Sequence, residues 1–255
     1  MSNQKTILIT GAGSGLGRGL AIALSRAGHA VIATDLDEAA AKETLAQLEH
    51  PDSAIAVPLD VTRDDQVRAL FEKTIHRPVD VLVNNAGLQH VAPLEEFGQD
   101  KWDQLLNVML RGACVMTRAV LPGMRTQGYG RVVNIGSIHS LVASPFKSAY
   151  VAAKHGLLGL AKVVALETAD VDVTINTICP SYIRTPLVDA QIANQAKVHG
   201  ISEAEVIDRI MLEPMPKKAF ITVDEVAETI LFLMSPAARN ITGQTITIDG
   251  GWTAR

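Results

Sequence analysis

Seven short apolar segments alternate with longer segments of helical periodicity along almost the whole chain of 255 residues. Most of these apolar segments are continuous, which is typical of parallel strands buried on both faces. Repeated strand–helix units need right-handed crossovers and predict an α/β fold, with a doubly wound seven-stranded parallel sheet and helices on both faces. The expected strands are Lys5–Thr10, Ala30–Thr34, Ala54–Leu59, Val79–Asn84, Arg131–Ile135, Val173–Ile178 and Gln244–Ile248. The expected helices cover about 15–27, 37–48, 64–76, 100–127, 148–169 and 223–235.

One stretch, 186–220, interrupts this alternation. It is expected to form one or two short helices, Val188–Val198 and Ser202–Leu212, between the last crossover strand and the last helix. A chain of 255 residues is at the upper end of what one hydrophobic core supports, and the sequence contains no repeat or low-complexity linker. We therefore expect a single domain over 1–255 with a helical insertion at about 186–220.

The charge and the cysteine content argue against several classes of protein. The formal net charge is −4, and no run rich in Lys or Arg indicates a nucleic-acid or anionic-membrane surface. The two cysteines, Cys114 and Cys179, lie in apolar stretches and favour reduced thiols in a cytoplasmic protein. No continuous apolar run reaches the roughly 18 residues of a membrane span, and the first ten residues show no cleavage site. Secretion, membrane insertion and a nucleic-acid partner are not expected.

The segment Thr10–Gly17 reads T-G-A-G-S-G-L-G and lies between the first expected strand and the first expected helix. Gly11, Gly15 and Gly17 allow a tight turn, close approach of the backbone to a pyrophosphate, and close packing of helix on strand. The phosphates would lie at the helix N-terminus, where free N–H groups favour negative charge. A glycine-rich stretch alone can be a simple turn, but this strand–turn–helix context favours a dinucleotide site in a Rossmann-type sheet.

Asp35 directly follows the second expected strand. A carboxylate there can accept both hydroxyls of an adenosine ribose and would repel the extra phosphate of NADP, which predicts NAD as the cofactor. The alternative is that Asp35 caps the next helix. No Arg or Lys lies between Thr10 and Gly17 or at Leu36–Asp37 to receive a 2′-phosphate. Asp60 and the N-N-A-G segment at 84–87 also follow strand ends, where ligands bind in such sheets, although each alone fits an ordinary loop.

Ser137 follows the fifth expected strand, and Tyr150 and Lys154 are four residues apart on one face of the next helix. A phenol with a pKa of about 10 is a poor base at neutral pH. A neighbouring ammonium favours the phenolate, as does the positive charge of an oxidised nicotinamide. Taken alone, Y-x-x-x-K is common and is usually a surface pair.

Together, T-G-x-x-x-G-x-G, N-N-A-G, a Ser before Y-x-x-x-K, and the terminal ITGQTITIDGG resemble the short-chain dehydrogenase/reductase family over essentially the whole chain. The resemblance implies that Ser137 orients the reacting oxygen, that Tyr150 is the acid/base, and that Lys154 binds the nicotinamide ribose and lowers the tyrosine pKa. It implies a homotetramer and no metal. Beside Gly11, Gly15, Gly17 and Asp35, the implied cofactor contacts are Ser14, Leu16, Asp60, Val61, Asn84, Ala86, Gly87, Tyr150, Lys154, Pro180, Ile183 and Thr185.

Met109 departs from the family pattern. Many members have an asparagine at this position, in the long helix after W-D, where it helps to hold a water between the lysine and solvent. Asn107 lies two residues earlier and would point about 200° away on a helix, so it should not substitute. The Tyr–Lys pair itself is intact.

Several segments resemble one subgroup of the family, the bacterial D-3-hydroxybutyrate dehydrogenases. They are GLQHVAPLEEF at 87–97, GSIHSLVASPFKSAYVAAKHG at 136–156, TPLVDAQI at 185–192 and DGGW at 249–252. The resemblance implies a carboxylate pocket and an aromatic enclosure for the methyl end of the substrate, formed with Ser137 and Tyr150 by Gln89, His139, Lys147, Gln191, Tyr182 and Trp252. Tyr182 stands where the subgroup has tryptophan, which adds a hydroxyl to that wall. Each polar residue alone also fits an ordinary loop position.

The resulting expectation is a cytoplasmic, NAD-dependent enzyme that reversibly oxidises (R)-3-hydroxybutyrate to acetoacetate. Lys147 can pair with the substrate carboxylate while Tyr150 holds the hydroxyl. The stretch around 186–215 is expected to close over the substrate and bring in Gln191. Two alternatives stay open. One is a related dehydrogenase for another small hydroxy acid, a sugar or a 3-oxoacyl thioester, and the other is a non-catalytic NAD-binding protein.

Overall fold

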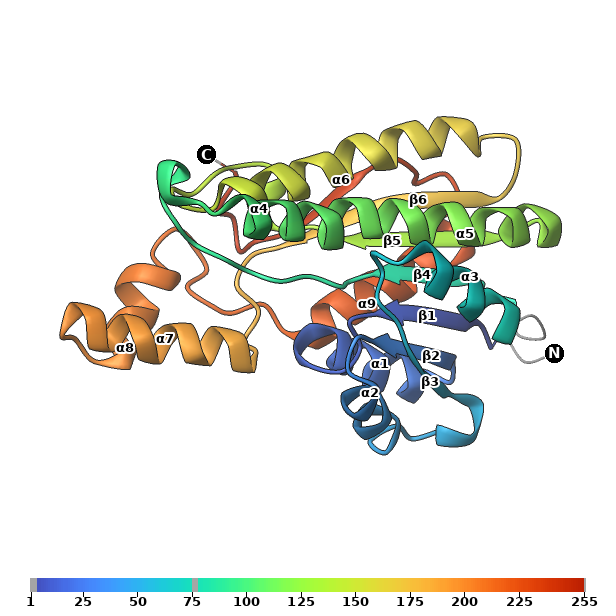
Figure 1. Cartoon of the computed structure of the whole chain (residues 1–255), viewed down its shortest axis with the longest axis horizontal. Helices are drawn as coiled ribbons and strands as arrows, with labels where there is room; N and C mark the ends of the chain where they lie inside the picture. The colour runs from blue at the N-terminus through green and yellow to red at the C-terminus, as the bar shows by residue number, and fades with distance from the viewer. Residues whose placement is uncertain (1–3, 75–77, 255) are drawn as a thin grey trace.

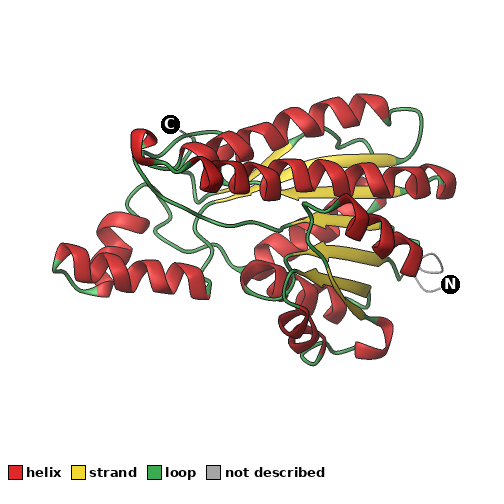
Figure 2. Cartoon of the chain, viewed as in Figure 1, coloured by secondary structure: helices red, strands yellow, loops and turns green. Residues whose placement is uncertain are grey.

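The computed structural model describes residues 4–74 and 78–254, and the described chain forms one sheet of seven strands (Figures 1 and 2). The strand order is β3-β2-β1-β4-β5-β6-β7, and all neighbouring strands are parallel. The order reverses between β1 and β4, which confirms the doubly wound, Rossmann-type α/β fold. The strands are β1 Thr6–Thr10, β2 Ala30–Asp35, β3 Ile55–Pro58, β4 Val81–Asn84, β5 Gly130–Ile135, β6 Val173–Pro180 and β7 Thr245–Ile248.

Helices cover both faces of the sheet (Figure 2). Ile7 and Ile9 of β1 pack toward α1 (Gly15–Arg26) and α9 (Val223–Met234). Leu8, between them, points to the other face and packs with α3 (Asp64–Lys73), α5 (Gly112–Gln127) and α6 (Ser148–Glu167). Because successive side chains of a strand point to opposite faces, this double cover explains why the strands are apolar throughout.

Some element boundaries differ from those expected. α2 (Glu38–Leu45), α3 and α6 end a few residues early, and residues 75–76 of the expected third helix lie outside the described residues. β6 continues two residues further than expected, to Pro180, because its pairing with β7 continues to Pro180 and Ile248. The extension carries the chain directly to the edge of the cleft described below.

The expected helix at 100–127 consists of three consecutive parts. α4 (Gln99–Leu106) is followed by a π-helical turn, Asn107–Arg111, and then by α5. In the π turn, the N–H of Gly112 donates to the carbonyl of Asn107 five residues earlier. Met109, in the middle of the turn, is buried. Gly112 gives room for this arrangement, since a Cβ there would lie only 2.7 Å from Cγ2 of Val61.

The insertion is helical, as expected. It contains α7 (Pro186–His199), α8 (Glu203–Val206) and a second π-helical turn, Ile207–Met211, and it projects beyond the sheet in Figure 1, where it is orange. Ile192, Val206 and Met211 form a small apolar cluster of their own, with Tyr182 and Phe220 packed against it. We call residues 186–211 the lid.

Two helical stretches, Gln99–Gln127 and Ser148–Glu167, are long and apolar enough to cross a membrane by length and composition alone. The sequence predicted no such segment because neither stretch is one continuous apolar run, although both have a high mean hydropathy over 18 residues. Both stretches lie against the sheet and contribute to its core through residues such as Val120 and Val164. Core helices of globular proteins have the same character, so the two stretches are weak evidence for a membrane span.

Candidate active site

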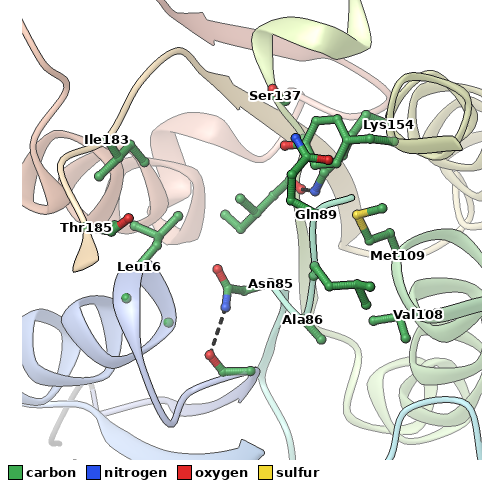
Figure 3. Close-up of a pocket in the computed structure, with 18 of the residues that line it drawn as sticks. Leu16, Asn85, Ala86, Gln89, Val108, Met109, Ser137, Lys154, Ile183 and Thr185 are labelled. Atoms are coloured by element: carbon green, nitrogen blue, oxygen red, sulfur yellow. Dashed lines mark hydrogen bonds between the residues drawn. The ribbon is translucent and has the colours of Figure 1, made fainter. Parts of the chain in front are cut away.

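A cleft of about 650 Å³ lies at the carboxyl edge of the sheet, between the strand ends and the lid. Figure 3 shows Leu16, Ile183 and Thr185 on one side of it and Val108, Met109 and Lys154 on the other. The cleft brings together the predicted site residues Gly11, Ser14, Gly15, Leu16, Gly17, Asp35, Asp60, Val61, Ala86, Gly87, Gln89, Ser137, His139, Lys147, Tyr150, Lys154, Pro180, Tyr182, Ile183, Thr185 and Gln191. These residues come from segments far apart in the sequence, so the fold and not local sequence assembles the site.

Two predicted residues, Asn84 and Trp252, do not line this cleft, so their direct contacts with a ligand stay predictions. The Asn84 side chain lies behind the cleft, where its amide donates to Asn134 Oδ1 (2.9 Å) and Thr117 Oγ1 (3.1 Å) and ties β4 to β5 and α5. Trp252 lies behind two lining residues, with its ring centroid 5.9 Å from that of Tyr182 and 6.2 Å from that of His139.

The glycine-rich turn is held close to the neighbouring strand end. Gly11 has a φ of +65°, and a Cβ there would lie 2.9 Å from the Cα of Ala86. Asn85, which lies in the N-N-A-G segment but was not assigned as a cofactor contact, donates from Nδ2 to the carbonyls of Thr10 and Gly11 at 2.9 and 3.0 Å; Figure 3 marks one of these bonds. Gly15 has a φ of +51° and has open space around it, with only Thr185 approaching within 4 Å. The turn therefore presents accessible backbone to the cleft, as phosphate binding requires.

Asp35 lies at the cleft and does not cap α2. Its Oδ2 accepts from the N–H of Gly13 at 2.8 Å and its Oδ1 accepts from the N–H of Asp37 at 3.0 Å. The capping residue of α2 is Asp37, whose side chain accepts from the N–H groups of Ala39 and Ala40. The capping alternative for Asp35 is therefore wrong. Its carboxylate is fixed in place with further lone pairs available for hydroxyl groups.

Arg18 is the cation nearest in sequence to the glycine-rich turn. Its guanidinium donates to the carbonyl of Gly13 and forms an ion pair with Glu43 at 3.2 Å. These contacts hold the turn and α2 together. They also occupy the arginine, so it does not lie free beside Asp35.

Ser137, Tyr150 and Lys154 meet at the end of β5. Burial raises the pKa of Tyr150, and its hydrogen bond with the Ser137 hydroxyl opposes that shift. Lys154 is buried, donates from Nζ to the carbonyl of Ile135 at 2.6 Å, and lies 5.6 Å from the centroid of the Tyr150 ring. Burial lowers the pKa of Lys154 to about 8. In the protein alone, burial therefore sets the direction of the Tyr150 pKa shift, which is opposite to the lowering by Lys154 that the sequence led us to expect.

Met109 occupies the wall of the cleft beside these residues. It lies against Gly87, where a Cβ would be 3.7 Å from the Met109 sulfur, and it lines the same cleft as Lys154. Asn107 is exposed and is not among the residues that line the cleft. Asn107 therefore lies away from the cleft, and that it does not replace the missing asparagine stays a prediction.

The polar residues expected around a substrate carboxylate gather on one side of Tyr150. Lys147 Nζ lies 3.4 Å and Ser144 Oγ lies 3.3 Å from Nε2 of His139. Burial, with a smaller effect of the Lys147 charge, lowers the pKa of His139 to about 4, so this imidazole is neutral at pH 7. Burial also lowers the pKa of Lys147. Gln89 and Gln191 line the same cleft from the loop after β4 and from the lid.

Comparison with known proteins agrees with this arrangement. Residues 11–253 match the family model described as enoyl-(acyl carrier protein) reductase. A D-beta-hydroxybutyrate dehydrogenase of Rhizobium meliloti is 43% identical, with 98% of this chain and 99% of the relative aligned. One of Cupriavidus necator is 41% identical over the full length of both chains.

Solved structures of similar fold include further oxidoreductases. A crystallised actinorhodin polyketide ketoreductase with NADPH matches with a TM-score of 0.92 and 30% identity, over 100% of this chain and 99% of the other. The chain belongs to the short-chain dehydrogenase/reductase family. It is accordingly an oxidoreductase of a family that uses nicotinamide cofactors, NAD or NADP, and its relatives with assigned activities include D-beta-hydroxybutyrate dehydrogenases.

Proposed function

We propose that this protein is an NAD-dependent dehydrogenase that reversibly oxidises (R)-3-hydroxybutyrate to acetoacetate. The observation that carries the proposal is the Lys147–His139 pair, with Nζ and Nε2 3.4 Å apart, in the same cleft as Tyr150. A short 3-hydroxy acid has a carboxylate for the lysine and a hydroxyl for the tyrosine, which follows three residues later. Two relatives named D-beta-hydroxybutyrate dehydrogenase, at 43% and 41% identity, support it.

The residues at the other end of the cleft fit a nicotinamide dinucleotide. Gly11 and Gly15 adopt positive φ values of +65° and +51°, and the backbone around Gly15 is open, which suits a pyrophosphate. The Asp35 carboxylate is held at the cleft by two N–H groups and can accept hydroxyls of the adenosine ribose. A 2′-phosphate beside this carboxylate would be repelled, which favours NAD over NADP.

The catalytic step is assigned to three side chains. A bound nicotinamide supplies the hydride acceptor in oxidation and the hydride donor in reduction. Tyr150 removes the proton of the substrate hydroxyl in oxidation and returns it in reduction. Ser137 donates a hydrogen bond to the reacting oxygen. Lys154, protonated below its pKa of about 8, places a positive charge beside Tyr150 and offsets the effect of burial on the phenol.

Two other functions fit the site less well. A 3-oxoacyl-[acyl-carrier-protein] reductase of Thermotoga maritima is 33% identical over 97% of this chain, so a 3-oxoacyl thioester is the leading alternative substrate. A thioester has no carboxylate for Lys147, and a half-buried lysine left without an anion is unfavourable. A non-catalytic protein would not need Tyr150 and Lys154, which are both retained.

Several further features belong to the proposal. We infer that the protein acts as a homotetramer in the cytoplasm on small hydroxy acids, and that it has no nucleic-acid or membrane partner. We also infer that chain 1–255 is one domain whose lid closes over the substrate and brings Gln191 to it. The lid has an apolar cluster of its own, which meets the main core only through partly buried residues such as Tyr182, Ile207 and Phe220, and this supports its movement as a unit.

Kinetics of Lys147→Ala test the proposal. Loss of a charge-assisted contact removes about 1.5–3 kcal/mol, so KM for (R)-3-hydroxybutyrate should rise roughly ten- to a hundred-fold. Binding of NADH should not change, because Lys147 lies on the substrate side. Methyl (R)-3-hydroxybutyrate, which lacks the charge, should respond little to the substitution. Equal wild-type activity on the ester and the free acid would contradict the carboxylate assignment.

A further inference from the structure

The backbone of Phe146 has an unusual conformation directly beside Lys147. Phe146 has a φ of +69°, and among the described residues only Lys218 is another non-glycine residue with positive φ. This left-handed region is strongly disfavoured for bulky side chains, so a phenylalanine there is uncommon and is found where the surrounding structure enforces it.

Packing of the phenylalanine ring does not account for the conformation. The side chain is 55% exposed and belongs to none of the apolar clusters formed by the described residues. The ring therefore gains little from its position. The conformation instead fixes the path of the backbone, and the contacts of that backbone account for it.

The backbone at Phe146 joins the two loops that carry the polar substrate-side residues. Its carbonyl accepts from the N–H of Ala92 at 3.0 Å, and Ala92 lies three residues after Gln89 in the loop that follows β4. The next residue is Lys147, whose own carbonyl accepts from Val151 as the first turn of α6 begins. Gln89 and Lys147 are thus connected through one short piece of backbone.

The chain before Phe146 is also fixed. Ser144 Oγ lies 3.3 Å from Nε2 of His139, the same nitrogen that Lys147 approaches to 3.4 Å. A change of φ at Phe146 rotates the incoming chain relative to α6. Lys147 would then move relative to Ser144 and His139, so the contacts of both residues with Nε2 of the imidazole could not be kept together.

We infer that Phe146 is a positioning residue, whose left-handed backbone sets Lys147 and Gln89 against the carboxylate of the substrate. This inference rests on the proposed function, because it assumes that Lys147 binds a carboxylate. It assigns the effect to the backbone and not to the aromatic ring. The activity of a variant at position 146 toward the acid should therefore depend on how well the new residue tolerates a positive φ.

A series at this one position separates backbone from ring. Phe146→Gly and Phe146→Asn adopt positive φ readily and should keep the wild-type ratio of kcat/KM between (R)-3-hydroxybutyrate and its methyl ester. Phe146→Val, which is β-branched, should reduce that ratio about ten-fold, mainly through KM for the acid, with the Kd for NADH unchanged. Phe146→Ala should fall between them and serves if the valine variant does not fold.

Two controls define the outcome. Leu141→Val introduces the same side chain in the same loop at a φ of −120°, where valine is tolerated, and should leave the ratio unchanged.

Lys147→Ala tests the proposed function separately. If Lys147→Ala lowers the acid-to-ester ratio but the valine and alanine variants of Phe146 do not, the inference is wrong and the proposed function stands. If Phe146→Gly loses the ratio as valine does, the ring and not the backbone is responsible, which also overturns it. If Lys147→Ala leaves the ratio unchanged, the proposed function itself fails.

Discussion

At the scale of single residues, burial controls the chemistry of the site. It raises the pKa of Tyr150 and lowers the pKa of Lys154 to about 8, so in the free protein both groups are shifted toward their neutral forms. A buried tyrosine that acts as a base needs a positive neighbour to stabilise its phenolate form. Lys154, 5.6 Å from the tyrosine ring and anchored to the carbonyl of Ile135, is the cation within the protein that meets this need.

Met109 tests whether the missing family asparagine matters. Tyr150→Phe should remove nearly all turnover, a loss of about 10²–10⁴-fold, because the acid/base is gone. Met109→Asn should change kcat by less than about ten-fold, since the charge of Lys154 acts on Tyr150 through space. Both variants are assayed across pH with NAD and (R)-3-hydroxybutyrate. A hundred-fold gain in Met109→Asn would show that the natural protein is an impaired catalyst and would reopen the non-catalytic alternative.

We expect the Asp35 carboxylate to determine the preference of the protein for NAD over NADP. Asp35→Ser removes the charge that would face a 2′-phosphate, so the preference for NAD, expressed as the ratio of kcat/KM values, should narrow by about ten-fold or more. Asp37→Ser, which also removes one carboxylate but can still cap α2, is the matched control and should leave the ratio nearly unchanged. Equal turnover of the wild-type protein with both cofactors would refute the assignment.

His139 should make the fold sensitive to mild acid. Its pKa is about 4 in the folded protein against 6.5 for a free histidine, so between these values the unfolded chain binds more protons. Stability is then lost as the pH falls from about 6.5 toward 4. Between pH 7 and pH 5, urea denaturation of the wild type should show about 1–2 kcal/mol more loss in the free energy of unfolding than His139→Gln. An identical pH dependence in the two proteins would mean that folding does not lower the pKa of His139.

At the scale of helices and strands, the sequence predicted the elements well and their fine structure poorly. All seven strands were expected from continuous apolar runs, and the structure pairs them in parallel. The π turn around Met109 was not foreseen, because one wider turn leaves the apolar periodicity of a long helix almost intact. Its effect is local but important, since it lies in the wall of the cleft.

The candidate site was predictable to the extent that residues lie within motifs. Ser137, Tyr150 and Lys154 have fixed spacing on one strand end and one helix. By contrast, Asn84 and Trp252 were expected to contact cofactor and substrate, but the structure does not place either among the residues that line the cleft. A sequence shows that such residues are near a strand end or a terminus, but the direction of a side chain depends on packing between distant segments.

The lid should respond to changes in its own apolar cluster. Ile192 is 2% exposed and packs with Val206 and Met211 in the lid cluster, which borders the main core through Tyr182 and Phe220. Ile192→Ala should raise KM for the hydroxy acid several-fold by loosening the lid, whereas Ile192→Val should have a smaller effect. The global unfolding midpoint should fall less than for Leu24→Ala in the main core. If Ile192→Ala leaves KM unchanged, closure of the lid does not contribute to substrate binding.

At the scale of the whole molecule, one cleft at the carboxyl edge of the sheet has room for both the proposed dinucleotide and the proposed small acid. The outward face of α6 carries Val163 and Leu166, which are 54% and 80% exposed. These apolar side chains are consistent with the proposed association of copies.

The most direct test is the rate of NADH formation by the purified wild-type protein with a small set of substrates. We expect efficient turnover of (R)-3-hydroxybutyrate with NAD. Turnover should be at least about ten-fold lower with the (S)-enantiomer, with the methyl ester and with NADP. The contradicting result would be little or no NADH from (R)-3-hydroxybutyrate while a 3-oxoacyl thioester is reduced efficiently. In that case Lys147 would not mark a carboxylate site, and the enzyme would belong with the acyl-carrier reductases.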